Sequence, residues 1–493
     1  MVKKFAFIQP LINDGNLTPP LGTLIMSAII EKEGWDIQFF DERFDINAVN
    51  PLIDFQPNMV GISAVTASIL RGFDLAGQIK RALPETIIVL GGPHPTAMPE
   101  EVAVCNSVDF VVVGEGEHTI KDLCDWYLSS REPSALEKIP NLCYTVNGKF
   151  IQNKNRSFLS SSELDILPRP AYHLLNIEEV FKEMTHGLFQ KGKRILPVMF
   201  SRGCPSQCTF CCRVMGYQIR YRNTEMIMNE IESLVKDYNL DEVWFEDDNF
   251  TANPKRAHEI LDYLIELNLG IYIKFANGIR ADGVDNKMLE KMQKAGCYNL
   301  SFAIESGSSR VLKMMKKNLS LIKAKENIDM AKSMGFLVGS NCIIGYPGET
   351  VDDVKESLDF FMDLNLDSMA ITSLIPFPGT ELRRICVENG YLTAEAENWN
   401  NYIFDINNPK ILIETECLDG KAITSLINNA YYRMYLNPWR VFRIIRHMKL
   451  ANIIKGVYVI MSKFYRNLKQ INYRHSSGLS NINKMGWDKR ENN

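Results

Sequence analysis

Short apolar runs alternate with amphipathic helical patterns over the first part of the chain. The runs predict five strands, at residues 3–9, 36–41, 59–63, 87–91 and 109–114. Near-continuous apolar stretches such as Ile87-Ile-Val-Leu90 suit strands that are buried on both faces of a parallel sheet. The pattern therefore predicts a doubly wound, Rossmann-like α/β domain over residues 1–140.

Loops that contain small residues follow four of these strands or their connections. Ligands of a doubly wound sheet bind at loops that leave the carboxyl ends of its strands, and small residues let a bulky ligand approach the backbone. One Gly-Gly or Gly-x-Gly alone is better explained as a tight turn. Four such loops at one sheet edge favour a binding site instead, with candidate contacts at Pro19, Gly22, Ser63, Gly91, Gly92, His94, Gly114, Glu115 and Gly116.

A hairpin and a linker follow the first domain. Asn147-Gly148 separates the apolar runs 142–146 and 149–152, which is a strong signal for a tight hairpin turn. The serines and prolines of residues 160–170 indicate a boundary. Residues 141–192 are therefore interpreted as a hairpin and linker.

Six further strand and helix patterns alternate across residues 193–392. The strands are expected at 196–200, 242–246, 272–276, 300–305, 337–344 and 369–375. Amphipathic helices lie between them, and the helix predicted over 224–236 carries Ile227, Ile231, Leu234 and Val235 on one face.

The pattern beyond residue 392 becomes helical and aromatic, and it stays so to residue 475. Arg440, Arg443, Arg446 and Lys449 recur at a spacing of three. The preferred interpretation is a packed helix with a solvated basic face, and the alternative is a helix on a membrane surface. The polar residues 476–493 are expected to be disordered.

Composition narrows the class of protein. A chain of 493 residues predicts several domains, and 46% hydrophobic with 23% charged residues is ordinary for a globular protein. A net charge of -4 gives no basic field, so nucleic acid is not an expected partner. The absence of a long apolar run and of a small disulfide-rich framework predicts a cytoplasmic protein without a membrane span. Peripheral contact with a membrane is left open.

Three cysteines are the most informative chemical feature. The segment Ser201-Arg-Gly-Cys204-Pro-Ser-Gln-Cys208-Thr-Phe-Cys211 has the spacing C-x3-C-x2-C. Three thiolates this close can hold three irons of a [4Fe-4S] cluster and leave the fourth iron free for another ligand. The alternative is structural zinc, which needs four ligands. Cys212 is the obvious fourth, but successive side chains usually diverge.

This motif and the strand-end loops after it closely resemble the radical S-adenosylmethionine (SAM) superfamily. The resemblance implies that Cys204, Cys208 and Cys211 bind the cluster, while the amino and carboxylate groups of SAM chelate the open iron. Reduction of the cluster then cleaves SAM to a 5′-deoxyadenosyl radical, which abstracts hydrogen from an unactivated position. The six βα units suit the partial (β/α)6 barrel of this superfamily, with its active site at the carboxyl ends of the strands.

Polar residues at the strand ends are the candidate SAM contacts. The resemblance implies that Asp247 or Asp248 contacts the SAM ammonium, and the alternative is a capped or solvated turn. Arg280 is a candidate for the SAM carboxylate or for pairing with a surface acid. The resemblance also implies contacts with SAM for Glu305, Ser306, Gly345 and, between two cysteines, the aromatic Phe210.

The loops of the first domain resemble the cobalamin-binding domain that precedes the core in one branch of the superfamily. The Asp-x-His-x-x-Gly signature of classical B12 enzymes is missing, so the resemblance implies cobalamin without a histidine ligand on cobalt. A cobalamin-dependent methyltransferase is expected, acting on an unactivated carbon or a phosphinate phosphorus of a small-molecule or lipid substrate. Flavodoxin or ferredoxin is the expected type of external electron donor. The alternatives are a cyclase, oxidase or rearrangement enzyme with the same domains and, from another class, an iron-sulfur electron carrier or sensor.

Overall fold

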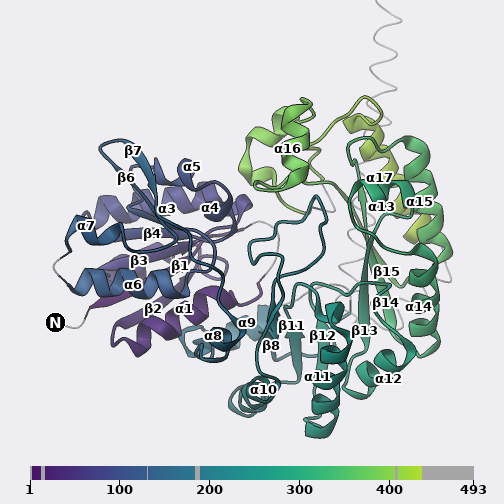
Figure 1. Cartoon of the computed structure of the whole chain (residues 1–493), viewed down its shortest axis with the longest axis horizontal. Coiled ribbons are helices and arrows are strands. Elements are labelled where there is room, and N and C mark those ends of the chain that lie inside the picture. Colours follow the sequence, from purple (N-terminus) through teal and green to yellow (C-terminus); the bar gives the residue numbers. More distant parts are fainter. Residues whose placement is uncertain (1–2, 13–16, 130, 184–188, 406–408, 436–493) are drawn as a thin grey trace, which may run out of the picture. The chain divides into compact units, whose positions relative to one another are not determined.

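The computed structural model describes residues 3–12, 17–129, 131–183, 189–405 and 409–435, which belong to one compact unit, Met1–Leu436. The predicted fold class is confirmed, because a doubly wound sheet precedes six βα units and a helical segment (Figure 1). The predicted basic helix with Arg440, Arg443, Arg446 and Lys449 and the polar tail 476–493 lie outside the described residues.

The first sheet has seven strands in the order β2-β1-β3-β4-β5-β6-β7. The five predicted strands are its parallel part, namely β1 (Lys4–Gln9), β2 (Asp36–Asp41), β3 (Met59–Ser63), β4 (Ile87–Gly91) and β5 (Phe110–Val112). The predicted hairpin is β6 (Leu142–Val146) and β7 (Lys149–Gln152). It does not stand apart as a linker, since β6 pairs antiparallel with β5 and so satisfies the open backbone edge of that strand.

Both faces of this sheet are covered, which explains its continuous apolar runs. Helices α1 (Leu21–Lys32) and α6 (Glu117–Leu128) pack together over the face to which Phe5 and Phe7 point. Helices α2 (Val49–Phe55) and α3 (Ile69–Ala82) cover Ala6 and Ile8 on the other face. Successive side chains of a strand alternate between faces, so each face has its own core. The shorter helices of this region are α4 (Pro93–Ala97), α5 (Pro99–Ala103) and α7 (Pro133–Leu136).

The six strands predicted for the second half are present as two parallel sheets of three. One has the order β12-β11-β8, with β8 (Ile195–Val198), β11 (Glu242–Phe245) and β12 (Tyr272–Phe275). The other has the order β13-β14-β15, with β13 (Asn299–Glu305), β14 (Leu337–Ile344) and β15 (Ser368–Ser373). Two parallel bridges, Ile273 to Cys297 and Ile279 to Phe302, join the sheets.

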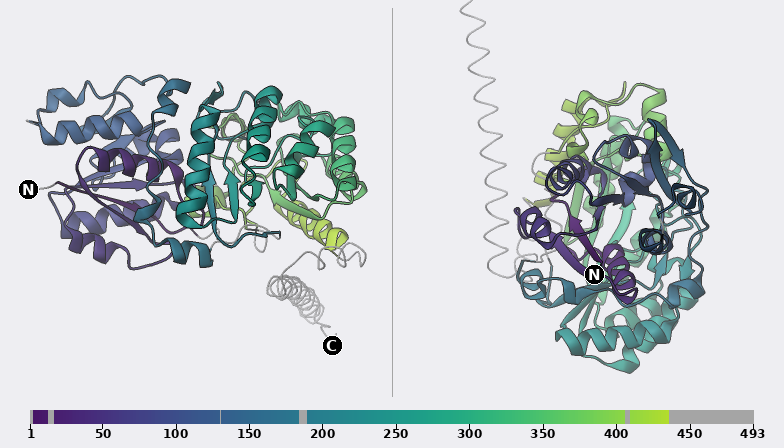
Figure 2. Two further views of the ribbon diagram at one scale, coloured as in Figure 1. Left: turned by 90° about the horizontal axis from the view of Figure 1, so that it is seen from below. Right: turned by 90° about the vertical axis from the view of Figure 1, so that its left-hand side faces the viewer.

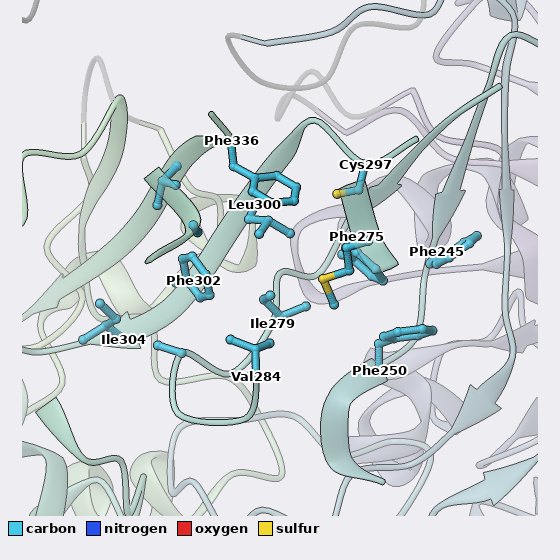
Figure 3. Packing of buried hydrophobic residues seen from close by; sticks show 14 of the residues in the cluster. Phe245, Phe250, Phe275, Ile279, Val284, Cys297, Leu300, Phe302, Ile304 and Phe336 are labelled. Atoms are coloured by element: carbon cyan, nitrogen blue, oxygen red, sulfur yellow. The ribbon is translucent and has the colours of Figure 1, made fainter. Parts of the chain in front are cut away.

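Helices flank these strands (Figure 2), and α10 (Thr224–Tyr238), α11 (Pro254–Leu267) and α12 (Asn286–Lys294) pack on each other in that order. On α10, the predicted apolar stripe buries Ile227, Ile231 and Leu234. Beside it, the ring centroids of Phe250 and Phe275 are 4.7 Å apart (Figure 3). The helices are α8 (Ser161–Asp165), α9 (Ile177–Glu183), α10 (Thr224–Tyr238), α11 (Pro254–Leu267), α12 (Asn286–Lys294), α13 (Ser309–Met314), α14 (Leu321–Ser333), α15 (Val351–Asp363), α16 (Glu381–Glu388) and α17 (Gly420–Tyr435).

A two-stranded antiparallel ribbon, which the sequence pattern does not predict, brackets the cysteine segment. It consists of β9 (Ser201–Arg202) and β10 (Arg220–Tyr221), with Arg202 opposite Arg220. The ribbon closes the base of a loop that runs from Gly203 to Ile219 and carries all three motif cysteines. A two-residue strand has no periodicity that a sequence pattern can show.

The C-terminal described residues return to both halves of the unit. Helix α17 packs on β15 and α15, and the indole Nε1 of Trp399 donates to Glu101 Oε1 of α5 at 2.7 Å. Within the part of the chain that the structure describes, we find no helix with the length and apolar character of a membrane span.

Gly61 is required by the packing of β1 against β3. A Cβ atom at Gly61 would lie 2.3 Å from Cε1 of Phe7. We predict that Gly61→Ala lowers the free energy of unfolding by about 1–3 kcal/mol, the usual cost of overpacking a core. Urea unfolding followed by circular dichroism measures the change. Gly77→Ala in α3 is the matched control, because its Cβ would meet only side-chain ends, Arg81 at 3.4 Å and Ser107 at 3.7 Å, and alanine favours a helix. Equal stability of the two variants would contradict the packing argument.

Candidate functional site

The first cysteine of the motif is fixed by the backbone on both sides. Gly203 has φ +91°, and a Cβ there would lie 2.4 Å from the carbonyl oxygen of Gln218, so only glycine fits. Its N–H donates to Asp248 Oδ2 at 3.0 Å, and the N–H of Cys204 donates to the carbonyl of Gly216 at 3.2 Å. Cys204 is therefore presented from a tightly closed turn.

The other two cysteines lie on a turn that is tied to the segment after α13. The Thr209 N–H donates to the Met315 carbonyl at 3.0 Å, and the Thr209 hydroxyl lies 2.8 Å from the Tyr346 hydroxyl. The Cys211 N–H donates to the Cys208 carbonyl at 3.3 Å. Cys208 is buried, while Cys211 is exposed at the surface. Phe210 between them packs into an apolar cluster with Tyr346.

The fourth cysteine of the run is directed elsewhere. The thiol of Cys212 lies 4.0 Å from the carbonyl oxygen of Pro378, beyond β15. This is the divergence of successive side chains that the sequence argument expects.

The donor set of the loop fits an iron-sulfur cluster. Its three cysteines lie within eight positions of one loop, and each thiolate can bind a different iron of one cluster.

Asp247 and Asp248 both hold groups of the protein. Asp247 Oδ1 accepts from the Ser201 hydroxyl at 2.6 Å and Oδ2 accepts from the Phe200 N–H at 3.3 Å, and burial raises the pKa of this carboxyl to about 6. Asp248 accepts from Gly203, as described above. The acids after β11 therefore anchor the entry to the cysteine loop, and a contact with SAM stays a prediction for both.

Asn249 is a residue that the sequence argument missed. Its side-chain amide lies 3.9 Å from the sulfur of Cys204 and points a donor at it. Asn249 is buried and follows directly after the two acids. The available signal was its place in the polar run Glu246-Asp-Asp-Asn249 at a strand end.

Arg280 pairs with an acid, and its predicted contact with the SAM carboxylate stays a prediction. Its guanidinium forms a bidentate pair with Asp282, at 2.9 and 3.0 Å, and also donates to the carbonyls of Lys317 and Asn318. Glu305 has φ +75° at the end of β13, and its carboxylate pairs with Lys317 Nζ at 3.1 Å. Both members of that pair are buried, and no sequence pattern singles out Lys317.

Ser306 and Gly345 serve the packing of neighbouring elements. The buried Ser306 hydroxyl lies 2.8 Å from the hydroxyl of Ser357 on α15, so it faces a helix. Gly345 has φ +102°, and its N–H donates to Glu349 Oε2 at 2.6 Å, which closes the turn after β14. Their predicted contacts with SAM are untested by these bonds and stay predictions.

A cavity of about 270 Å³ lies at the carboxyl edge of the first sheet. Its opposite wall is formed by Arg202, Val214 and Met215, from the ribbon and the cysteine loop. Small residues along the sheet edge leave room for a bulky ligand against the backbone, which fits a corrinoid. The predicted contacts that line it are Gly22, Ser63, Gly91, Gly92, Gly114, Glu115 and Gly116.

Two predicted contacts, Pro19 and His94, are not in the wall of this cavity. His94 is fully buried, its Nδ1 lies 3.3 Å from the Thr66 hydroxyl, and its ring stands edge-on to Trp399 with centroids 5.0 Å apart. Burial, aided by the charge of Arg383, lowers the pKa of His94 to about 4. The His94 ring therefore packs against Trp399. The position of His94 in the sequence, next to the glycines, could not show this contact.

Four buried charges join the sheet edge to the ribbon. Arg202 contacts Glu115 at 3.0 Å and Glu117 at 2.7 Å, and Arg220 contacts Glu115 at 2.8 Å. All four side chains are only 6–7% exposed. Burial lowers the pKa of Arg202, but Glu117 and Glu115 outweigh it and raise that pKa above the ordinary value. The carboxylate of Glu115, which was predicted as a cofactor contact, thus forms ion pairs with two arginines.

Two family models match this chain. The Radical SAM superfamily matches residues 198–361, and the B12 binding domain matches residues 11–124. An uncharacterized methyltransferase of Pyrococcus horikoshii is 30% identical over 432 residues, which cover 86% of this chain and 89% of the relative. The chain belongs to the radical SAM superfamily and carries a B12-binding domain.

Further relatives and solved structures are similar to this radical SAM protein in sequence or in fold. The cytidylyl-2-hydroxyethylphosphonate methyltransferase of Streptomyces wedmorensis is 27% identical, with 77% of this chain and 79% of the relative covered. An anaerobic magnesium-protoporphyrin IX monomethyl ester cyclase of Cereibacter sphaeroides is 24% identical, with 89% and 72% covered. The radical SAM methyltransferase TsrM of Kitasatospora setae shares the fold, with a TM-score of 0.67, 17% identity and coverage of 78% and 76%. The cobalamin-dependent enzyme OxsB also shares the fold, with a TM-score of 0.64 and 18% identity, and the match covers 88% of this chain and 61% of OxsB.

The enzyme class and the cofactor set predicted from sequence are confirmed by this membership. The radical SAM domain takes a [4Fe-4S] cluster and SAM, and the B12-binding domain takes cobalamin. The electron carrier without a substrate is therefore disfavoured.

Glu246 at the end of β11 gives a test of charge at this site. Burial, with a smaller effect from Asp247, raises its pKa from 4.5 to about 7. A raised carboxyl pKa means that the folded state favours the protonated form, so stability present below about pH 4.5 is lost as the pH rises to about 7. We predict that Glu246→Gln, which is neutral throughout, is more stable than the parent at pH 8 by about 1–3 kcal/mol, with the gap closing towards pH 5.

Urea unfolding of both proteins at pH 5 and pH 8 measures this difference. The exposed Glu266→Gln in α11 is the matched control and should show no such gap. A Glu246→Gln variant that is no more stable than the parent at pH 8 would refute the assignment.

Proposed function

We propose that the protein transfers a methyl group to an unactivated carbon or a phosphinate phosphorus of a small-molecule or lipid substrate. The observation that carries the proposal is the shared cavity. The edge of the B12-binding domain forms one wall, and Val214 and Met215, which lie two and three positions after Cys212, help to form the other. Cobalamin at the sheet edge and a cluster on the cysteine loop would then face one space.

In this proposal, some residues bind the cofactors and others keep the cysteine loop in place. Cys204, Cys208 and Cys211 would hold the cluster, and the glycines of the sheet edge would hold cobalamin. When bound, these groups supply one-electron cleavage of SAM and a transferable methyl group. Asp248 and Asp247 keep the loop in place through Gly203 and Ser201, and the remaining oxygen of Asp248 is the better placed to accept the SAM ammonium.

The relatives support methyl transfer and also an alternative. The Pyrococcus and Streptomyces relatives are named as methyltransferases, and the second acts on a phosphonate by its name. The cyclase relative supports the rival proposal, in which the same domains close a ring without methyl transfer. The substrate class is therefore tested by product analysis.

An external electron donor such as flavodoxin or ferredoxin is part of the proposal. Cys211 is exposed, so the cysteine loop reaches the surface where a donor can approach it. Cytoplasmic location and peripheral membrane contact stay predictions, since the latter concerns the basic segment 440–449, outside the described residues.

We predict that the anaerobically reconstituted protein binds about four irons, and that Cys204→Ala, Cys208→Ala and Cys211→Ala each lose most of the cluster. Cys212→Ala is the matched control and should keep it, because its thiol faces the Pro378 carbonyl. Iron and sulfide analysis with the visible absorption spectrum measures the content. Equal loss from Cys212→Ala would overturn the ligand assignment.

We predict that the reduced holoenzyme with SAM and cobalamin forms 5′-deoxyadenosine, and that S-adenosylhomocysteine appears as well when methyl transfer occurs. Chromatography with mass spectrometry measures both products in the presence of candidate phosphinates, tetrapyrroles and isoprenoid lipids. The Cys204→Ala variant is the negative control. 5′-Deoxyadenosine without S-adenosylhomocysteine for a substrate that is converted would favour the cyclase or oxidase alternative, and neither product would contradict the proposal.

A further inference from the structure

Arg202 lies where the cysteine loop and the cavity wall meet. It is the last residue of β9, it stands two positions before Cys204, and it lines the cavity together with Glu115 and Glu117. One short piece of backbone therefore connects the first motif cysteine to the space at the sheet edge.

The guanidinium of Arg202 is held from two directions. Nη1 contacts Glu115 at 3.0 Å and Nη2 contacts Glu117 at 2.7 Å. These two acids flank Gly116 at the start of α6. A planar guanidinium that bridges two carboxylates fixes both distance and direction, which a single point charge does not.

Arg220 closes the arrangement from the opposite strand. It is paired in register with Arg202, contacts both oxygens of Glu115 at 2.8 Å, and donates to the carbonyl of Met215 at 2.8 Å. Met215 lines the far side of the cavity. The two walls are thus tied to each other by buried charges, and parting them would leave those charges without partners in a poorly solvated place.

We propose that Arg202 is a positioning residue that sets the spacing between the corrinoid at the sheet edge and the cluster on the cysteine loop. The proposal rests on the cofactors of the family and goes beyond methyl transfer, which it does not assume. A purely structural role would lower the stability of the protein and leave the spacing between bound cofactors unchanged.

The spacing can be measured in the holoenzyme without a substrate. Co(II) cobalamin and the reduced cluster each carry an unpaired electron, so their magnetic interaction in pulsed electron paramagnetic resonance reports their separation. Arg202→Gln removes the charge and the simultaneous contacts with Glu115 and Glu117. Arg202→Lys keeps only the charge. Arg384→Gln, which breaks an exposed pair with Glu388, is the matched control.

The expected result is a shifted or broadened cobalt-to-cluster distance in Arg202→Gln, with partial recovery in Arg202→Lys and none of these changes in Arg384→Gln. Both Arg202 variants should keep their iron content and bind cobalamin within about tenfold of the parent affinity. A parental distance in Arg202→Gln, or complete loss of either cofactor from both Arg202 variants, would overturn the proposal. Because no product is measured, failure here leaves the methyl-transfer test unaffected.

Discussion

Two arginines and two glutamates, all buried, hold the cysteine loop against the edge of the B12-binding domain. Removing four charges from water is unfavourable, and only close pairing offsets it. Such a network adds little to stability compared with an apolar contact of the same size, but it tolerates little sliding, because each displacement exposes a charge without a partner. Glu115, whose two carboxylate oxygens accept four hydrogen bonds from Arg202, Arg220 and the N–H of Leu159, is the centre of this constraint.

Carboxylates also hold the cysteine loop on its other side, at the mouth of the barrel. The ribbon that carries Arg202 begins at Ser201, whose hydroxyl is held by Asp247, and continues to Gly203, whose N–H is held by Asp248. The loop is thus anchored by carboxylates of two domains on its two sides. A loop with so few regular backbone bonds keeps one geometry because charged side chains replace them.

Sequence periodicity predicted the strands of both halves, because each has an apolar pattern of its own. The spacing of the motif identified the cysteines, and the positions of the loops after the strands identified the small residues of the sheet edge. Sequence reasoning missed Arg202, Arg220 and Asn249, whose partners lie 45 or more positions away in the chain, and Lys317, whose partner Glu305 lies 12 positions away. His94, which it predicted as a cofactor contact, packs edge-on to Trp399, about three hundred positions further on. Local patterns encode faces of helices and strands, whereas a buried ion pair is encoded only by the fold that brings its members together.

Backbone strain and buried charge are combined beside Cys208. Glu305 keeps a left-handed backbone at the end of β13, where the pairing with β14 shifts in register, and such a conformation persists only when its surroundings determine it. Those surroundings are Lys317, which pairs with the Glu305 carboxylate, and Arg280, which binds the Lys317 carbonyl. Burial raises the pKa of the Cys208 thiol, and the charges of Lys317 and Arg280 act in the opposite sense. A buried thiolate needs cations nearby, so the strained turn at Glu305 has a consequence for the loop: it holds an ammonium group beside the most deeply buried of the three cysteines.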